Sequence, residues 1–258
     1  MRISSFEFLA FLVLVVAFTV ASANAAPIRF DFEGYVTKGE SSSTHANSDG
    51  EPRLLLPGTP AYGSTISGYY IVDPTATDRA AETNRGNYLN AVIEFQVDFG
   101  GLNYTVDFYQ GGFTDIRVED NISGRDQYLV WIRESNLPGT GIVGPSVSGY
   151  DPIDFQLSLF DWESTTPDLI NGDALPLHAP DLSLVDNPFY PTDPYLGRYG
   201  LLFMGYELAG EPRQARIYGE ITSLNSTVLP LPAAAWLFLS GLGVLRFAGW
   251  RRVNAQST

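Results

Sequence analysis

Apolar and polar residues alternate along much of the chain between residues 28 and 224. Alternation is typical of a half-buried β-strand, because successive side chains of a strand point to opposite faces. The clearest example is residues 93–99, followed by Gly100-Gly101 and a second alternating run over 102–108. Two glycines between such runs predict a two-residue hairpin, since glycine adopts a positive φ without strain.

The other alternating runs extend this pattern over one domain, which we place at residues 26–227. No amphipathic helix of three turns is predicted there, and turn-rich stretches separate the runs. Many short strands with Gly- and Pro-rich turns favour an all-β fold, an antiparallel β-sandwich or jelly-roll-like domain of about nine strands. The remaining runs lie at 28–37, 65–72, 113–119, 127–134, 153–161, 199–207 and 215–224.

The N-terminus has the pattern of a secretory signal peptide. Arg2 precedes an apolar stretch at 8–20, and Ala23 and Ala25 supply the small residues that signal peptidase reads. We therefore predict a signal peptide over residues 1–25, with cleavage after Ala25. The alternative is a short N-terminal membrane anchor, but the apolar stretch is shorter than the ~20 residues that a spanning helix needs.

The C-terminus contains a second apolar segment. Residues 233–250 number 18 and contain one charge, Arg246. At about 1.5 Å rise per residue this length just spans a hydrocarbon core, so we predict a transmembrane helix there. Arg251 and Arg252 follow directly. Positive residues stay on the cytoplasmic side, which places the β domain outside the cell membrane.

The order of features in residues 228–258 is specific. Pro230, Leu231 and Pro232 precede an apolar span that begins Ala-Ala-Ala-Trp-Leu-Phe, and the arginine pair closes it. This combination resembles the PEP-CTERM sorting signal, in the variant with Pro-Leu-Pro in place of Pro-Glu-Pro. The resemblance implies a bacterial protein exported through the inner membrane and processed near the proline motif by an exosortase, a cysteine transpeptidase-like enzyme. The alternative is a simple C-terminal anchor that nothing cleaves.

The resemblance also carries expectations about the body of the protein. Residues 68–74 and 219–224 loosely resemble the β-sandwich domain that many PEP-CTERM proteins carry, and proteins with this signal are linked to exopolysaccharide and the extracellular matrix of biofilms. This similarity implies no activity and assigns no functional residue.

Composition excludes several classes of function. The chain has no cysteine, which rules out disulfides, a thiolate zinc site and a cysteine nucleophile. The formal net charge is −14, and removing the two terminal segments, with four arginines and one acid, leaves 11 basic and 28 acidic residues, or −17. This excess argues against nucleic acid as the main partner.

Candidate chemistry is sparse. A glycoside hydrolase needs two carboxyl groups about 5–9.5 Å apart, but the acids on the predicted strands alternate with apolar residues and are best interpreted as polar strand faces. The two histidines, His45 and His178, fall in irregular segments and suggest no zinc site or catalytic triad. The candidate carboxylates are Glu94, Asp98, Asp107, Asp154, Asp161 and Glu163.

Two binding hypotheses remain. Asp73 and Asp78, with two threonines between them, offer the oxygen ligands that calcium prefers, although Asp-Pro and Thr are also ordinary turn formers. Tyr69, Trp131 and Phe160 fall on the nominally polar faces of their strands, where an aromatic ring can stack on a sugar. We expect the irregular stretch 163–197, which holds six prolines, to cover these rings.

The sequence therefore predicts an exported protein at the cell surface or in the extracellular matrix, with no catalytic activity and no cofactor beyond the calcium hypothesis. Its expected role is structural or carbohydrate-interacting, and its expected partners are signal peptidase, the exosortase, the inner membrane and exopolysaccharide. One alternative is a secreted hydrolase that acts on polysaccharide through paired carboxylates. The other is an exported domain without a function of its own, whose main feature is its sorting signal.

Overall fold

The computed structural model describes residues 26–41, 57–106, 113–133, 141–161, 168–185, 200–208 and 214–230. Ile28–Thr227 forms one compact unit, while Met1–Pro27 and Val228–Thr258 belong to another. Within the described ranges, no helix has the length and apolar character needed to cross a bilayer. The signal peptide at 1–25 and the membrane helix at 233–250 lie outside these ranges and stay predictions.

The described part of the domain is all-β, as expected from the alternation. A 3-10 turn, Leu182–Leu184, lies between the ninth and tenth of its strands. The strands are β1 (Ile28–Ser41), β2 (Thr65–Val72), β3 (Arg85–Leu89), β4 (Val92–Phe99), β5 (Leu102–Val106), β6 (Phe113–Glu119), β7 (Asp126–Arg133), β8 (Ile142–Val143), β9 (Tyr150–Asp161), β10 (Leu201–Leu208) and β11 (Gln214–Val228).

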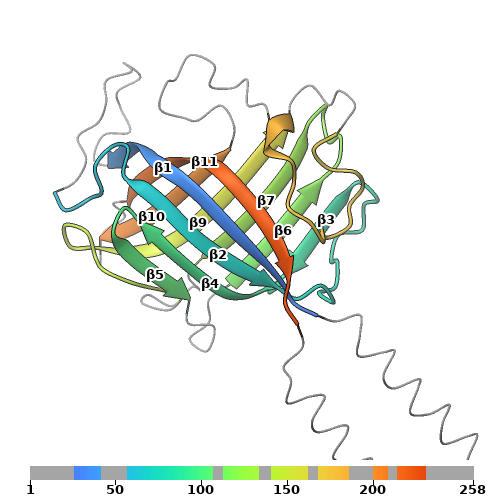
Figure 1. Cartoon of the computed structure of the whole chain (residues 1–258), viewed down its shortest axis with the longest axis horizontal. Coiled ribbons are helices and arrows are strands. Elements are labelled where there is room, and N and C mark those ends of the chain that lie inside the picture. Colours follow the sequence, from blue (N-terminus) through green and yellow to red (C-terminus); the bar gives the residue numbers. More distant parts are fainter. Residues whose placement is uncertain are drawn as a thin grey trace, which may run out of the picture. The chain divides into compact units, whose positions relative to one another are not determined.

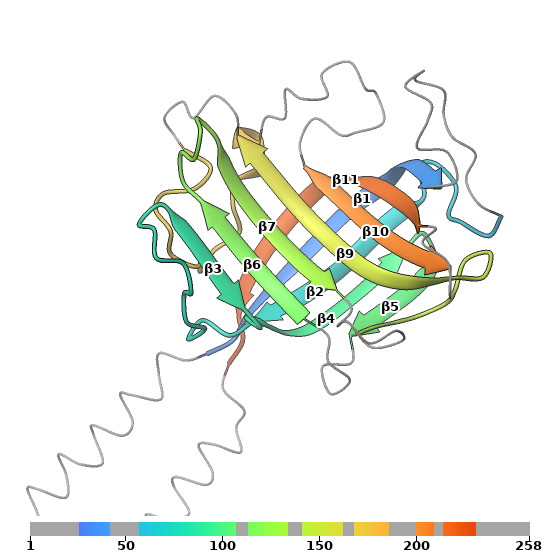
Figure 2. The same ribbon diagram turned by 180° about the vertical axis from the view of Figure 1, so that it is seen from behind.

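All of these strands belong to one antiparallel sheet that curls over on itself (Figure 1). Its order is β3-β6-β7-β9-β10-β11-β1-β2-β4-β5-β8. We call β1, β2, β4, β5 and β8 half A, and β3, β6, β7, β9, β10 and β11 half B. Seen from behind, β7, β9 and β10 of half B lie in front of β1 and β2 of half A (Figure 2).

The first and last strands of the domain join the two halves. Leu229 N–H donates to the Pro27 carbonyl at 2.8 Å, and the Thr222 hydroxyl donates to the Glu33 carbonyl at 3.3 Å. The start of β1 therefore lies beside the end of β11. Both strands are long, with 14 and 15 residues, which lets them run across the whole curl.

Aromatic side chains fill the space between the halves. Phe155 of β9 packs against Phe32 of β1 and Phe95 of β4, with ring centroids 5.6 and 4.8 Å apart. The hydroxyls of Tyr70 (β2) and Tyr128 (β7) share a hydrogen bond of 2.9 Å in the core, which satisfies both buried groups. Tyr104 (β5) and Tyr206 (β10) form a second such pair, at 2.8 Å.

Two details of the predicted fold need correction. The two layers are halves of one continuous curled sheet, because β11 pairs with β1, a contact between chain ends that no local pattern reveals. The described residues also contain eleven strands instead of about nine. The additional strands are β3, where Gly86 occupies an inward position and hides the alternation, and β8, which is two residues long. The Gly100-Gly101 hairpin is confirmed, with φ of 68° and 94°.

The irregular segment 168–185 closes one side of the core. Leu169, Ile170, Leu175 and Val185 are buried in it. Asp126 at the start of β7 accepts a hydrogen bond from the Ile170 N–H, and the Tyr88 hydroxyl of β3 donates to the Asp173 carbonyl. Asp126 and Tyr88 both occupy inward positions. The described part of this segment thus packs inside the curl, and the expectation that it covers the outward aromatic rings is wrong for residues 168–185.

Candidate ligand-binding face

Two cross-strand rows of side chains lie next to each other on the outer surface of half B. In one row Arg133 is opposite Asp154, Asp154 is opposite Gly205 and Gly205 is opposite Arg216. In the second row the same pairings join Trp131, Gln156, Phe203 and Tyr218. We call these eight residues the Trp131 face. They point outward because the residues between them, such as Val130, Ile132 and Phe155, are buried in the core.

Guanidinium groups stack on the aromatic rings of this face. Arg133 lies over the Trp131 ring with its central carbon 4.4 Å from the centroid, and Arg117 approaches the same ring at 5.6 Å. Arg216 lies 5.5 Å from the Phe203 centroid. Each such contact contributes about 0.5–1 kcal/mol at exposed sites and also fixes the orientation of the planar guanidinium. The Trp131 ring is half-buried between its two arginines.

A carboxyl group sits between the two cations of the first row. Burial raises the pKa of Asp154 to about 6, although a weak contact with the Trp131 indole and the charges of Arg216 and Arg133 oppose this rise. The indole N–H does not reach the geometry of a regular hydrogen bond. No ion pair joins Arg133 or Arg216 to any residue that the structure describes.

Gly205 makes room for this carboxyl. A Cβ built at position 205 would collide with Asp154 Oδ1, and its nearest neighbours are the end of the Asp154 side chain and the Phe203 ring. The β-ladder between β9 and β10 is irregular directly after Gly205. Glycine is thus required here by the close approach of a neighbouring side chain, which is one of the few reasons for glycine inside a strand.

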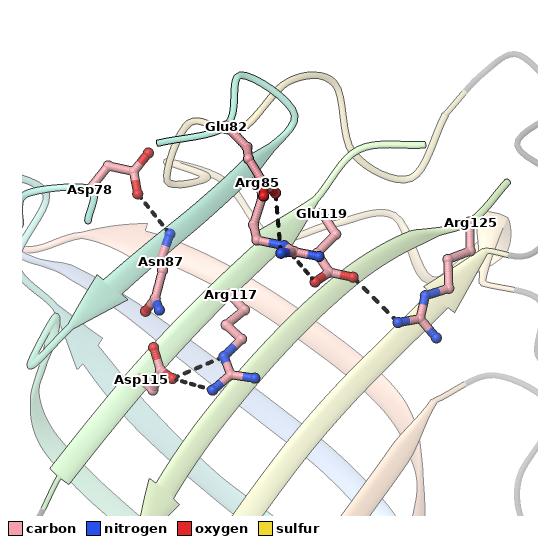
Figure 3. Close-up of polar contacts among 8 residues, drawn as sticks. All are labelled: Asp78, Glu82, Arg85, Asn87, Asp115, Arg117, Glu119 and Arg125. Atoms are coloured by element: carbon pink, nitrogen blue, oxygen red, sulfur yellow. Dashed lines mark hydrogen bonds and ion pairs between the residues drawn. The ribbon is translucent and has the colours of Figure 1, made fainter. Parts of the chain in front are cut away.

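A polar cluster borders the Trp131 face on strands β3 and β6 and directly before β7 (Figure 3). Glu119 accepts from both Arg85 and Arg125, at 3.1 and 3.4 Å, and Arg85 also reaches Glu82 at 3.1 Å. Arg117 pairs with the buried Asp115 at 3.0 Å. These arginines are neutralised by carboxylates of the sheet itself, so their main role is structural.

Arginine is distributed unevenly over the protein. The described ranges contain seven arginines, and five of them (Arg85, Arg117, Arg125, Arg133 and Arg216) lie on half B or directly before one of its strands. The full chain has 15 basic and 29 acidic residues. The outer surface of half B, with its arginines and aromatic rings, therefore differs in composition from the acidic protein as a whole.

Half A carries the counterpart of this face at Tyr69. Arg29 stacks on the Tyr69 ring at 3.8 Å and pairs with Asp31 at 2.7 Å, while the Tyr69 hydroxyl donates to Glu94 at 2.6 Å. The hydrogen bond to Glu94, more than any other interaction, raises the pKa of Tyr69. We call Arg29, Asp31, Tyr69 and Glu94 the Tyr69 cluster. Its strong polar groups bind one another.

The structure confirms the outward positions of Tyr69, Trp131 and Phe160, and distributes the candidate carboxylates over separate places. Glu94 belongs to the Tyr69 cluster, and Asp98 accepts from the Gly101 N–H in the hairpin. Asp161 is buried opposite Asp126 at the far end of β9 from Asp154. Asp107 and Glu163 lie outside the described residues, as does His45, while His178 is exposed.

The two predicted calcium ligands stabilise separate turns. Asp73 Oδ1 accepts from the amide and the hydroxyl of Thr75, and Asp78 Oδ1 accepts from the amides of Ala80 and Asn87. Over the described ranges, no group of three His, Asp or Glu side chains comes together. Calcium binding by Asp73 and Asp78 stays a prediction.

The predicted sorting motif begins two residues after the end of β11 at Val228. Leu229 is hydrogen-bonded to Pro27, and Pro230, the first residue of the motif, is exposed. Leu231, Pro232, Arg251 and Arg252 lie outside the described residues, and so do Ala23 and Ala25. Ala26 would be the first residue after the predicted signal cleavage. Its neighbour in the sequence, Pro27, contacts Leu229, which directly precedes the predicted sorting motif.

Comparison with known proteins adds no further assignment: no protein-family model, no curated protein and no solved structure matches the chain. Sequence reasoning identified Trp131 and Asp154 separately but missed Arg133, Gly205, Phe203, Arg216 and Tyr218 as their neighbours. The available signal was weak. Arg133 follows the apolar Ile132 and Arg216 stands between two apolar residues, but the register that brings these strands together is not local.

Proposed function

We propose that this protein is an exported, non-catalytic component of the bacterial cell surface or extracellular matrix that binds polysaccharide through the Trp131 face. The observation that carries the proposal is the half-buried Trp131 ring held at an outward position by Arg117 and Arg133. A sugar ring has an apolar face and a polar edge. An aromatic ring can contact the apolar face of the sugar, and hydrogen-bond donors beside the ring can bind its polar edge. Aromatic and arginine side chains are enriched at binding surfaces for the same reason.

Gln156 and Tyr218 add neutral polar groups to the second row of this face. Together with the guanidinium groups they provide donors at several positions across four adjacent strands, which lie about 4.8 Å apart. The array is built on strands, and rigid elements hold binding groups more accurately than loops do. An extended chain of sugars suits such a flat, long surface better than a small molecule does, because small ligands are usually bound in concave sites.

Export and processing are the second part of the proposal and rest on the sequence. The predicted signal cleavage after Ala25 and the motif at Pro230-Leu231-Pro232 flank the β domain. The hydrogen bond between Leu229 and Pro27 supports a common exit point for both terminal segments. We infer that signal peptidase and an exosortase-type enzyme act close to the same end of β1 and β11.

Native gels that contain polysaccharide test the binding function. The full chain, kept soluble in a zwitterionic detergent without sugar groups, should migrate more slowly in gels with embedded polysaccharide, and Trp131→Ala should abolish at least nine-tenths of this retardation. Tyr69→Ala is the matched control, since it removes an outward aromatic ring on half A, and it should migrate like the wild type. Equal retardation of wild type and Trp131→Ala on every polysaccharide would contradict the proposal.

Processing is tested separately in cells. The wild type should be shortened near Pro230 and released from the inner membrane, while Pro230→Ala/Pro232→Ala should remain full length there. Mass spectrometry of the C-terminus, together with membrane fractionation, distinguishes the two. A wild type that is never shortened would leave a simple membrane anchor as the correct interpretation.

A further inference from the structure

We propose, building on the proposed function, that the ligand is an acidic polysaccharide, and that Arg133 and Arg216 bind the carboxylates of its uronic acid units while Asp154 competes with the ligand for both guanidinium groups. The proposal names a substrate class for the Trp131 face and a group that regulates its affinity. Protonation of Asp154 removes the competitor, so acid conditions should strengthen binding.

The first argument is the state of the arginines. Arg85, Arg117 and Arg125 have carboxylate partners within 3.4 Å on the sheet. Arg133 and Arg216, in contrast, form no ion pair with a described residue, and their guanidinium groups stack on Trp131 and Phe203. A guanidinium presents a planar fork of donors that matches a carboxylate with two parallel hydrogen bonds.

The second argument is the position of Asp154. Its neighbours across the ladders are Arg133 on β7 and Gly205 on β10, and Arg216 on β11 lies opposite Gly205. The glycine contributes no side chain, so the carboxyl occupies the space between the two cations. The nearest further acids on these strands are Asp151 and Glu207, which pair opposite each other beyond the irregularity after Gly205. A ligand carboxylate and an ionised Asp154 would therefore seek the same two partners.

The third argument is that Asp154 can change its charge under ordinary conditions. Burial raises the pKa of Asp154 to about 6, so the group is mostly neutral at pH 5.0 and mostly ionised at pH 7.5. The carboxyl of a uronic acid, like an α-substituted carboxyl group with a pKa near ~3.5, stays ionised over this whole range. The ligand keeps its charge while the competitor loses its own.

The net charge of −14 acts against this ligand at long range. Repulsion between the protein and a polyanion is screened beyond about 8 Å at physiological salt, whereas direct contacts with guanidinium groups are screened less. Binding should therefore persist at 0.15 M salt and should depend on the two arginines individually. Arg29 on half A gives no such site, because it is already paired with Asp31.

The test compares one polymer in two chemical forms. Polygalacturonate carries free carboxylates, and its methyl ester has the same backbone without the charge. We expect the wild-type full chain to bind the acid at least tenfold more tightly than the ester at pH 5.0, and to lose about fivefold or more of its affinity for the acid at pH 7.5. Isothermal titration calorimetry at 0.15 M salt measures both quantities, and this arm needs no variant.

Three variants locate the effect. Asp154→Asn should bind the acid at pH 7.5 as tightly as the wild type does at pH 5.0. Arg133→Gln/Arg216→Gln should lose the preference for the acid while it still binds the ester. Arg29→Gln, which changes an arginine on half A, is the control and should behave like the wild type. Unfolding curves for each variant establish that it is folded at the temperature of the titration.

The outcomes separate the two proposals. If the wild type binds both polymers equally, or binds the acid with the same affinity at both pH values, this inference is wrong, while loss of binding in Trp131→Ala would still support the proposed function. If no polysaccharide binds to any form of the protein, both proposals fail.

Discussion

The Tyr69 cluster and the Trp131 face place the same elements, an outward aromatic ring under an arginine, on opposite halves of the curled sheet. They differ in what surrounds the arginine. Arg29 has Asp31 at 2.7 Å beside it on the same strand, and the Tyr69 hydroxyl is bound to Glu94. Arg133 has no ion pair with a described residue, and its neighbouring acid, Asp154, is partly desolvated with a raised pKa.

The two sites therefore differ in whether their polar side chains bind one another. In the Tyr69 cluster each strong donor has an internal acceptor, so a ligand would have to break these contacts to bind. On the Trp131 face the guanidinium groups of Arg133 and Arg216 are oriented by stacking and form no ion pair with a described residue, and the Asp154 carboxyl is buried at a cost. Features that cost stability without an internal compensation are often kept for function.

The largest expected effect concerns the cost of burying Asp154. A carboxyl whose pKa is raised from 3.8 to about 6 in the folded state binds protons more tightly there than in the unfolded chain. Its ionisation therefore destabilises the fold as pH rises from about 4 to above 6, by up to about 3 kcal/mol. Asp154→Asn should be more stable than the wild type by up to this amount at pH 7.5 and equal to it near pH 4.

Urea unfolding at several pH values measures this difference. Glu94→Gln in the Tyr69 cluster is the control for removing a carboxylate charge from an exposed site, and at pH 7.5 it should change stability by less than about 0.5 kcal/mol. A wild type and an Asp154→Asn variant with parallel pH profiles would show that Asp154 is not the titrating group.

The second prediction distinguishes arginines that hold the sheet together from arginines that remain available. Arg117→Gln leaves Asp115 as a buried carboxylate without its partner, with a side chain only 5% exposed, and should cost about 1–3 kcal/mol. Arg133→Gln breaks no ion pair with a described residue but loses the stacking on Trp131, and should cost no more than about 0.5–1 kcal/mol. Equal losses for the two variants in urea unfolding would remove the distinction between them.

How far the sequence predicts this arrangement depends on how local each feature is. Alternation placed Tyr69, Trp131 and Phe160 outward and predicted the Gly100-Gly101 hairpin, since both depend on neighbouring residues alone. The curl of the sheet depends on the pairing of β1 with β11, at opposite ends of the domain. The periodicity of the sequence does not indicate such a long-range contact. Without it, the sequence predicts two separate layers.

The same limit explains the site. Trp131 and Asp154 could be selected individually as outward residues, but their relation to Arg216 depends on three successive registers, β7 with β9, β9 with β10, and β10 with β11. A slip of one residue in any of these would turn the partner to the other face. The pKa of Asp154 depends in turn on this packing, so it was beyond sequence reasoning as well.

A smaller effect is expected at Gly205. Gly205→Ala introduces a methyl group where Asp154 Oδ1 now lies, so the carboxyl must turn away toward solvent. Overpacking of this kind costs about 1–3 kcal/mol, and we expect the low end because the obstructing atom ends a flexible side chain. With the carboxyl in water, the stability of Gly205→Ala should vary with pH between 4 and 7.5 by less than half as much as that of the wild type. An unchanged pH profile in urea unfolding would place the origin of the raised pKa elsewhere.

The smallest effect is expected in the Tyr69 cluster, where it tests whether that cluster is only a satisfied surface. Tyr69→Phe removes the hydroxyl that donates to Glu94 at 2.6 Å but keeps the ring under Arg29. Because this hydrogen bond is exposed, water replaces the lost donor, and the expected cost in urea unfolding is about 0.5 kcal/mol or less. Affinity for polysaccharide should be unchanged. A weakened affinity would extend the binding surface to half A and end the contrast between the two halves, because an internally satisfied cluster would then bind ligand as well.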